Sequence, residues 1–304
     1  MNPGPHTLQG TNTYLVGAGC DVKVLVDTGE DSTAEEWLAN LISLIRATKT
    51  KRLSHVFLTH GHHDHQGGVV KLLKALKKEG MSTAPVVYKR LMPNGGDYPP
   101  VGGYKCLHIQ DGQEFTIQGG KDMHGNEAPS TTLKAYYTPG HTDDSICFLI
   151  KEDMALFSGD TVLGCGSAVF DNLTDLMSSL EKMRRLMLCA ETNDAGSLPL
   201  ALHTIYPGHG PVCTKDGLRK IDDYLENRRQ REAAIVRALQ ESGAQPLSGM
   251  QLVDIVYRDV KLSLVLRLSA AITLHHHLEK LKSEGLVAER WPDLWLMINS
   301  QKQE

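Results

Sequence analysis

Short runs of apolar and β-branched residues alternate along the chain with longer segments in which apolar residues recur every three or four positions. The runs with the length and composition of buried strands are residues 22–26, 53–58, 133–137, 147–150 and 154–157. The segments with helical spacing are residues 34–48, 69–79 and 174–189. This alternation predicts an α+β fold in which two packed sheets carry helices on their outer faces.

The pattern changes beyond residue 214. A long, highly charged helix is predicted for residues 216–240, and a break follows at Gly243. The remaining predicted elements are a short helix at 250–257, a longer helix at 262–282, and strand-like segments at 286–289 and 294–298. This order resembles that of a winged helix. We therefore expect two domains, residues 1–214 and residues 215–304.

The turn between the strand at 53–58 and the helix at 69–79 is rich in metal-binding residue types. His60 and His62 are two apart on extended chain and can point to the same side, while Asp64 and His65 lie where the helix begins. The next residues, Gly67 and Gly68, let backbone and helix pack closely behind them. Imidazole and carboxylate suit zinc and also tolerate manganese, iron or cobalt, so the turn predicts a metal site.

The motif His-x-His-x-Asp-His after a strand resembles that of the metallo-β-lactamase superfamily. Further motifs of this family follow in order, each after a short apolar run: Thr-Pro-Gly-His at 138–141, Ser-Gly-Asp at 158–160 and Pro-Gly-His at 207–209. The resemblance implies an αββα sandwich, followed here by the small winged-helix-like domain. It also implies that Asp27, at the end of the first predicted strand, supports the ligand loop by hydrogen bonding.

The same resemblance implies a centre of two zinc ions. His60, His62 and His141 would hold one ion, Asp64, His65 and His209 would hold the other, and Asp160 would bridge them. In this family the centre carries out hydrolysis by metal-hydroxide attack. We expect Asp64 and Asp160 to be catalytic. The sequence leaves open whether Asp64 or a metal-bound water gives the proton to the leaving oxygen.

Residues 2–16 and 273–285 resemble the β-lactamase-like protein 2 group, whose animal members are mitochondrial endoribonucleases. The resemblance implies cleavage of single-stranded RNA, with the catalytic domain attacking the phosphodiester and the tail holding the strand. The cations of the tail that would contact RNA are Arg228, Arg229, Arg231, Lys280 and Lys282. That group has a further strand before residue 2, so we expect one sheet to lack an edge strand.

Thioester hydrolysis is the alternative function. Polyketide-releasing thioesterases and hydroxyacylglutathione hydrolases share the metal motifs, and the former share much of the opening segment. The predicted winged-helix tail argues against the glutathione enzymes. A binding module without catalysis is disfavoured because all seven ligands are present.

The amino-acid composition bears on the class of protein, its binding partners and its compartment. Of 304 residues, 41% are hydrophobic and 22% charged, as in an ordinary globular protein. The net charge of −4 gives no overall attraction to nucleic acid, so RNA binding would need a local basic patch. No apolar run reaches the ~20 residues of a membrane span. Six cysteines without a Cys-x-x-Cys pair are typical of free thiols in a reducing compartment, so we expect an intracellular protein. The resemblance to a group with mitochondrial members implies the mitochondrial matrix, with the cytoplasm as the alternative.

Overall fold

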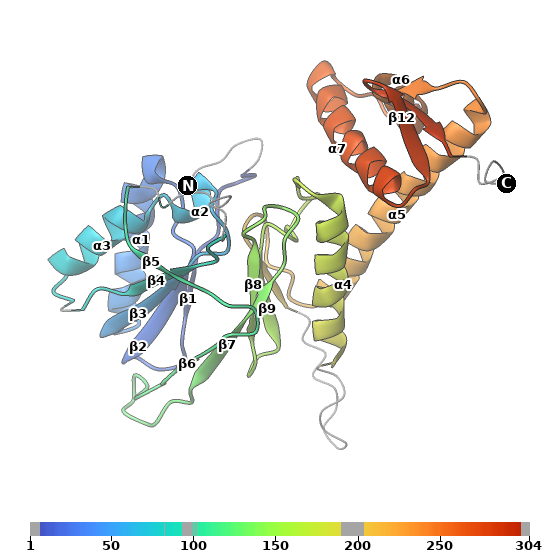
Figure 1. The fold of residues 1–304 in the computed structure, drawn as a ribbon. Helices are drawn as coiled ribbons and strands as arrows, with labels where there is room; N and C mark the ends of the chain where they lie inside the picture. The colour runs from blue at the N-terminus through green and yellow to red at the C-terminus, as the bar shows by residue number, and fades with distance from the viewer. Residues whose placement is uncertain (1–6, 82, 93–99, 101, 190–203, 299–304) are drawn as a thin grey trace.

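The computed structural model describes residues 7–81, 83–92, 100, 102–189 and 204–298 (Figure 1). Two five-stranded sheets lie face to face at the centre of the catalytic domain, and a smaller three-stranded sheet belongs to the C-terminal domain.

The first sheet has the strand order β1-β2-β3-β4-β5. Its strands are β1 (Tyr14–Val16), β2 (Val22–Val26), β3 (Arg52–Phe57), β4 (Val86–Lys89) and β5 (Cys106–His108). β1 pairs antiparallel with β2, and the other neighbours pair in parallel. The outer face of this sheet is covered by α1 (Ala34–Ala47) and α3 (Val69–Lys78), with the one-turn helix η1 (Asp31–Thr33) before α1 and α2 (His63–Gln66) before α3.

The second sheet has the order β10-β9-β8-β7-β6. Its strands are β6 (Glu114–Ile117), β7 (Thr131–Tyr137), β8 (Ile146–Ile150), β9 (Ala155–Gly159) and β10 (Ile205–Pro207). β10 runs parallel to β9, and the other neighbours are antiparallel. The outer face of this sheet is covered by α4 (Leu173–Cys189) and the first half of α5 (Gly217–Ser242), which completes four layers.

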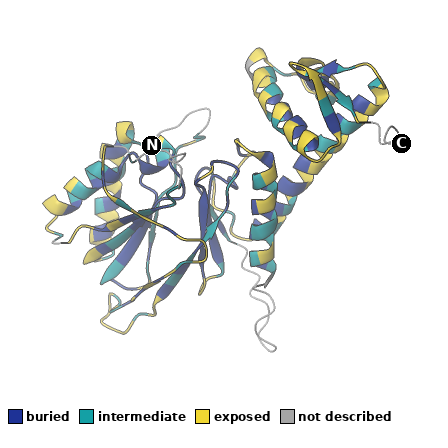
Figure 2. Ribbon diagram, viewed as in Figure 1, coloured by how far each residue is buried: buried dark blue, intermediate teal, exposed yellow. Residues whose placement is uncertain are grey.

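The central strands are buried on both faces, as Figure 2 shows for the region between the helices. In β2, Val24 and Val26 face the second sheet, while Leu25 faces α1 and α3. Successive side chains of a strand point to opposite faces, so a strand between two apolar layers needs a continuous apolar run. This explains why β2, β3, β8 and β9 could be predicted from runs of apolar residues in the sequence.

The C-terminal domain contains α6 (Gly249–Val256), α7 (Leu264–Ser283) and a sheet of order β11-β13-β12. Its strands are β11 (Leu247–Ser248), β12 (Val287–Trp291) and β13 (Leu294–Met297). Ser248 begins α6 with a capping box, in which its hydroxyl accepts from the Gln251 N–H and the Gln251 side chain accepts from the Ser248 N–H. The fully buried Trp295 fills the centre of this domain.

Helix α5 connects the two domains (Figure 1). Ile221 and Leu225 pack into the core below the second sheet, whereas Ile235 and Leu239 pack into the C-terminal core. The helix begins at Gly217, just after the boundary that we predicted between residues 214 and 215, and it contributes side chains to both cores. The predicted αββα sandwich with a winged-helix-like domain is confirmed, and the predicted helices and strands lie within a few residues of the observed ones.

Candidate metal centre

All seven predicted ligands lie at one edge of the sandwich, where strands of both sheets end. The turn after β3 carries four of them, and the segments after β7, β9 and β10 carry His141, Asp160 and His209. Their donor atoms form two groups, each with all atoms within 4.8 Å of one another. The groups are His60, His62, His141 and Asp160, and Asp64, His65 and His209.

In the first group, three imidazole nitrogens converge on one point. His60 Nε2 lies 2.9 Å from His62 Nδ1 and 3.2 Å from His141 Nε2. Asp160 Oδ2 lies 3.7 Å from His141 Nε2. This convergence matches the ligand set for a first-row metal ion or zinc.

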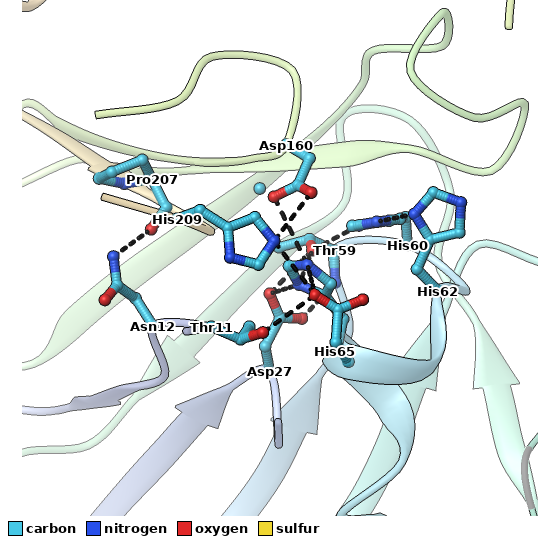
Figure 3. Close-up of polar contacts among 12 residues, drawn as sticks. Thr11, Asn12, Asp27, Thr59, His60, His62, His65, Asp160, Pro207 and His209 are labelled. Carbon is cyan, nitrogen blue, oxygen red and sulfur yellow. Dashed lines mark hydrogen bonds and ion pairs between the residues drawn. The ribbon is translucent and has the colours of Figure 1, made fainter. Parts of the chain in front are cut away.

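Asp160 also reaches the second group. Its carboxylate lies 3.2 Å from His209 Nε2 and 3.5 Å from His65 Nε2, and Asp64 Oδ2 lies 3.1 Å from His209 Nε2 (Figure 3). Within the described residues, the buried atoms His65 Nε2 and Asp160 Oδ1 have no hydrogen-bond partner. Buried polar atoms without partners are rare unless an ion or water satisfies them, so these residues fit a bound metal.

Hydrogen bonds on the far side of each ring fix which nitrogen faces the centre. His65 Nδ1 lies 2.8 Å from Asp27 Oδ2, His141 Nδ1 lies 2.7 Å from the Val169 carbonyl oxygen, and His209 Nδ1 lies 3.2 Å from that of Gly10. Each Nδ1–H can donate to its acceptor, which leaves the Nε2 lone pair for a metal.

Asp27 has the supporting position that the family resemblance implied. Its carboxylate accepts from the Thr59 N–H and the Thr59 hydroxyl, both at 2.8 Å, in addition to facing His65 (Figure 3). The residue adopts a φ of 58°, a conformation that costs energy outside glycine but is least unfavourable for Asp and Asn. This strained position lets one carboxylate fix both the start of the ligand turn and a ligand ring.

Two glycines allow close approach of the backbone. A Cβ atom at Gly208 would lie 2.2 Å from Asp160 Oδ1, and one at Gly68 would lie 2.1 Å from the Thr28 carbonyl oxygen. A side chain at Gly208 would therefore displace the carboxylate shared by the two groups. Gly68 acts behind the turn, as its position in the sequence predicted.

The two groups differ in protonation. Burial lowers the pKa of His60 well below its usual value and that of His62 to about 4, and neighbouring histidines add to both effects. Burial would also lower the pKa values of His65 and His209. The neighbouring carboxylates outweigh this effect of burial. They raise the pKa of His65 well above its usual value and that of His209 to about 9. Without metal, the second group therefore holds protons that the first does not.

A cavity of about 320 Å³ opens over both groups. His62 and Asp64 line its polar side, whereas Leu163 and Val169 contribute apolar surface. The wall formed by residues 163–171 is held by α5, because the Leu163 N–H donates to the Tyr224 hydroxyl at 3.0 Å. Arg228 also holds this wall, through hydrogen bonds of 2.5 Å to the Ser167 hydroxyl and 3.1 Å to the Ala168 carbonyl oxygen.

Sequence reasoning gave no role to the polar residues at 11–14. The Thr11 hydroxyl donates to Asp64 Oδ2 at 3.0 Å, and the Asn12 amide donates to the Pro207 carbonyl oxygen at 3.0 Å (Figure 3). The Asn12 amide also donates to the Gly210 carbonyl oxygen, at 2.8 Å. The Tyr14 hydroxyl donates to Pro207 as well, at 2.7 Å. This segment therefore fixes Asp64 and the loop that carries His209. Its only signal in the sequence is a run of Thr and Asn before a short strand.

A buried ion pair, also missed, supports the loop of His141. Lys89 Nζ lies 2.8 Å from Asp144 Oδ2, and both side chains are fully buried. Asp144 Oδ1 accepts from the Thr142 hydroxyl at 2.8 Å, directly beside the ligand. A lysine at the end of a strand usually reaches solvent, so no local signal distinguishes this one.

The five cations predicted to contact RNA lie in different surroundings. Arg229, Lys280 and Lys282 form ion pairs with carboxylates at 2.6, 2.7 and 3.0 Å. Arg228 is buried against the cavity wall. The Arg231 guanidinium lies 4.0 Å from the centroid of the Tyr257 ring. The structure does not bring the five together into one patch. Their contact with RNA stays a prediction.

Comparison with known families covers both domains. The family described as the metallo-beta-lactamase superfamily matches residues 6–209, and that described as the beta-lactamase associated winged helix domain matches residues 248–295. Among the described residues, no helix is both long and apolar enough to cross a membrane.

Two relatives by sequence bear different functional names. The chain is 36% identical to a beta-lactamase-like protein 2 homolog of Caenorhabditis elegans, over 94% of this chain and 83% of that protein. It is 38% identical to an atrochrysone carboxyl ACP thioesterase of Aspergillus fumigatus, over 78% of this chain and 46% of that protein. A beta-lactamase domain protein from Burkholderia ambifaria has the same fold, with a TM-score of 0.66, 18% identity, and coverage of 97% of this chain and 89% of that one.

Proposed function

The chain belongs to the metallo-β-lactamase superfamily of hydrolases, and from this premise we propose that it is a zinc-dependent endoribonuclease that cleaves single-stranded RNA. One observation supports this choice of substrate: the likeness to beta-lactamase-like protein 2 homologs extends through the sandwich and the winged helix, over 94% of the chain. The group is the one that the opening segment and the tail resemble.

The chain's own residues would hold the two zinc ions and shape the reaction. When bound, such ions lower the pKa of a coordinated water and neutralise charge on the group under attack. The Thr11 hydroxyl and the His209 ring orient Asp64, whose carboxylate faces the cavity and is the side chain best placed to move a proton. Asp160 keeps the two groups in a fixed relation, because it faces His141 of the first group and His65 and His209 of the second.

Thioester hydrolysis is the second candidate, favoured by the 38% identity to a fungal ACP thioesterase. That likeness covers 78% of the chain, less than the share covered by the proposed group. The metal centre itself does not discriminate, because one centre of this kind serves esters, thioesters and phosphodiesters alike.

The deciding experiment offers the zinc-loaded protein a single-stranded RNA oligomer and an acyl phosphopantetheine thioester side by side. We expect RNA cleavage with 5′-phosphate and 3′-hydroxyl ends, because water attacks phosphorus and the 3′-oxygen leaves with a proton. A 2′,3′-cyclic phosphate end would contradict this route, since it requires attack by the ribose. Intact RNA together with rapid thioester cleavage would establish the alternative.

A further inference from the structure

A second hollow, of about 570 Å³, lies beside the metal cavity along α5. It shares Gly166 and Ser167 with the metal cavity, so these two exposed residues form the only wall segment common to both linings among the described residues. A Cβ atom at Gly166 would meet nothing within 4 Å, and its φ of 72° favours glycine. At Gly166, therefore, no side chain obstructs the passage between the two hollows. We call the second hollow the α5 groove.

The α5 groove carries more positive than negative side chains. Its cations are Lys220, Arg228 and Arg231, and its carboxylates are Asp223 and Glu226. Lys220, Asn227 and Arg231, which are spaced seven and four residues apart, share one face of α5. The helix runs from the sandwich to the C-terminal domain (Figure 1). A strand lying along this face would leave the metal cavity over Gly166 and pass each cation in turn.

The two cations at the ends of the α5 groove are positioned by aromatic rings. Lys220 Nζ lies 5.6 Å from the centroid of the Tyr224 ring, and Arg231 lies 4.0 Å from that of Tyr257. Within the described residues, neither cation forms an ion pair with a carboxylate. An aromatic ring orients a cation without neutralising it, so both retain their charge for a ligand. Arg229, Lys280 and Lys282 differ in this respect, because carboxylates already pair with them.

We propose that the α5 groove binds two backbone phosphates of the RNA strand, in the stretch that flanks the nucleotide in the metal cavity. The inference rests on the proposed function, since it places the flanking part of the same substrate. Lys220 and Arg231 each donate to the oxygens of one of these phosphates, and the Asn227 amide on the same face supplies a neutral donor. Arg228 forms the floor of the α5 groove and keeps its hydrogen bonds to Ser167 and Ala168 between the two hollows.

The test compares two full-length double variants that lose the same charge from the same helix. Lys220→Ala/Arg231→Ala removes the two cations at the ends of the α5 groove and leaves Arg228 in place, whereas Arg219→Ala/Arg237→Ala removes two exposed cations of the same helix that lie outside the groove. Binding of a fluorescent single-stranded RNA oligomer to the metal-free proteins is measured over a range of salt concentrations. Hydrolysis of the oligomer and of bis(p-nitrophenyl) phosphate is measured with the zinc-loaded proteins.

We expect the groove variant to bind the oligomer about tenfold more weakly, with a salt slope shallower by about 1.4, because each cation that pairs with a phosphate of a single strand adds roughly 0.7 to that slope. KM for the oligomer should rise, while hydrolysis of the small diester, which ends within the metal cavity, stays unchanged. The control variant should match the unaltered protein in all four measurements.

Other outcomes overturn the inference. Equal losses of RNA affinity in both variants would mean that the charge of the protein, and not the α5 groove, determines binding. Unchanged RNA affinity in the groove variant would exclude the α5 groove as a binding site, while the endoribonuclease proposal would stand. If the unaltered protein neither binds nor cleaves RNA, the proposed function fails and the inference fails with it. A groove variant that loses affinity only for a phosphopantetheine thioester would assign the α5 groove to the other substrate class.

Discussion

Metal uptake is expected to release protons from one half of the centre and not from the other. Burial and neighbouring histidines lower the pKa values of His60 and His62, so both rings are neutral at pH 7 and can bind metal as they are. The carboxylates around His65 and His209 raise the pKa values of these rings, to about 9 for His209. Both rings therefore carry a proton at pH 7 that must leave before Nε2 can bind metal.

The cost of this proton release follows from the pKa. For His209, with a pKa of about 9, deprotonation at pH 7 costs roughly 3 kcal/mol, at about 1.4 kcal/mol per pH unit. The apparent affinity of the second group should thus rise about tenfold per pH unit for each proton displaced, until the pH passes the raised pKa. The first group lacks this cost and should fill first.

The assay is calorimetric titration of the metal-free protein with Zn²⁺ at pH 7, in buffers that differ in heat of ionisation. We expect almost no proton release with the first equivalent and about two protons with the second. His209→Gln should remove one of the released protons, whereas His62→Gln should weaken the first step and leave the release unchanged. Equal release at both steps, or none at the second, would refute the assignment of charge.

Two further predictions concern the support of the ligands. Asp27→Asn weakens the acceptor that orients His65, so metal affinity measured by competition with a chelator should fall about 10–100-fold, and a change below twofold would contradict this role. Lys89→Met leaves the buried Asp144 carboxylate without its cation, so the free energy of unfolding in urea should fall by about 3–5 kcal/mol. Lys151→Met breaks an exposed ion pair and should change the free energy of unfolding little. Equal losses of unfolding free energy in the two variants would contradict the expectation that the buried pair contributes more than the exposed one.

Within the sandwich, the strands that sequence patterns predicted are those with apolar neighbours on both faces. β8 and β9 are buried along their whole length, so their residues had to form continuous apolar runs. By contrast, β11 contains two residues and exists because it pairs with β13 across the end of the chain. No local pattern of two residues can indicate a partner that lies so far along the sequence.

The predicted ligands follow the same logic. His141, Asp160 and His209 each come directly after a strand, and the ends of these strands meet at one edge, so the motif order sufficed to bring them together. The residues that support the ligand loops could not be predicted in this way. Asn12 reaches the carbonyl oxygens of Pro207 at the end of β10 and of Gly210 beyond it, and Lys89 on the first sheet reaches Asp144 before β8 of the second. Such pairs are defined by tertiary structure, and each partner alone looks like an ordinary polar residue.

The charged helix α5 shows most clearly what sequence alone could not separate. Its arginines were grouped by proximity in the chain, yet neighbours on a helix point in different directions. Arg229 points to Glu181 on α4, whereas Arg228, one residue earlier, supports the wall of the metal cavity and stacks on Phe170 at 4.6 Å. A change at Arg228 would alter the shape of the cavity and the groove together, so it cannot distinguish substrate binding from chemistry. Only residues such as Arg231, which line the groove without holding the wall, can make that distinction.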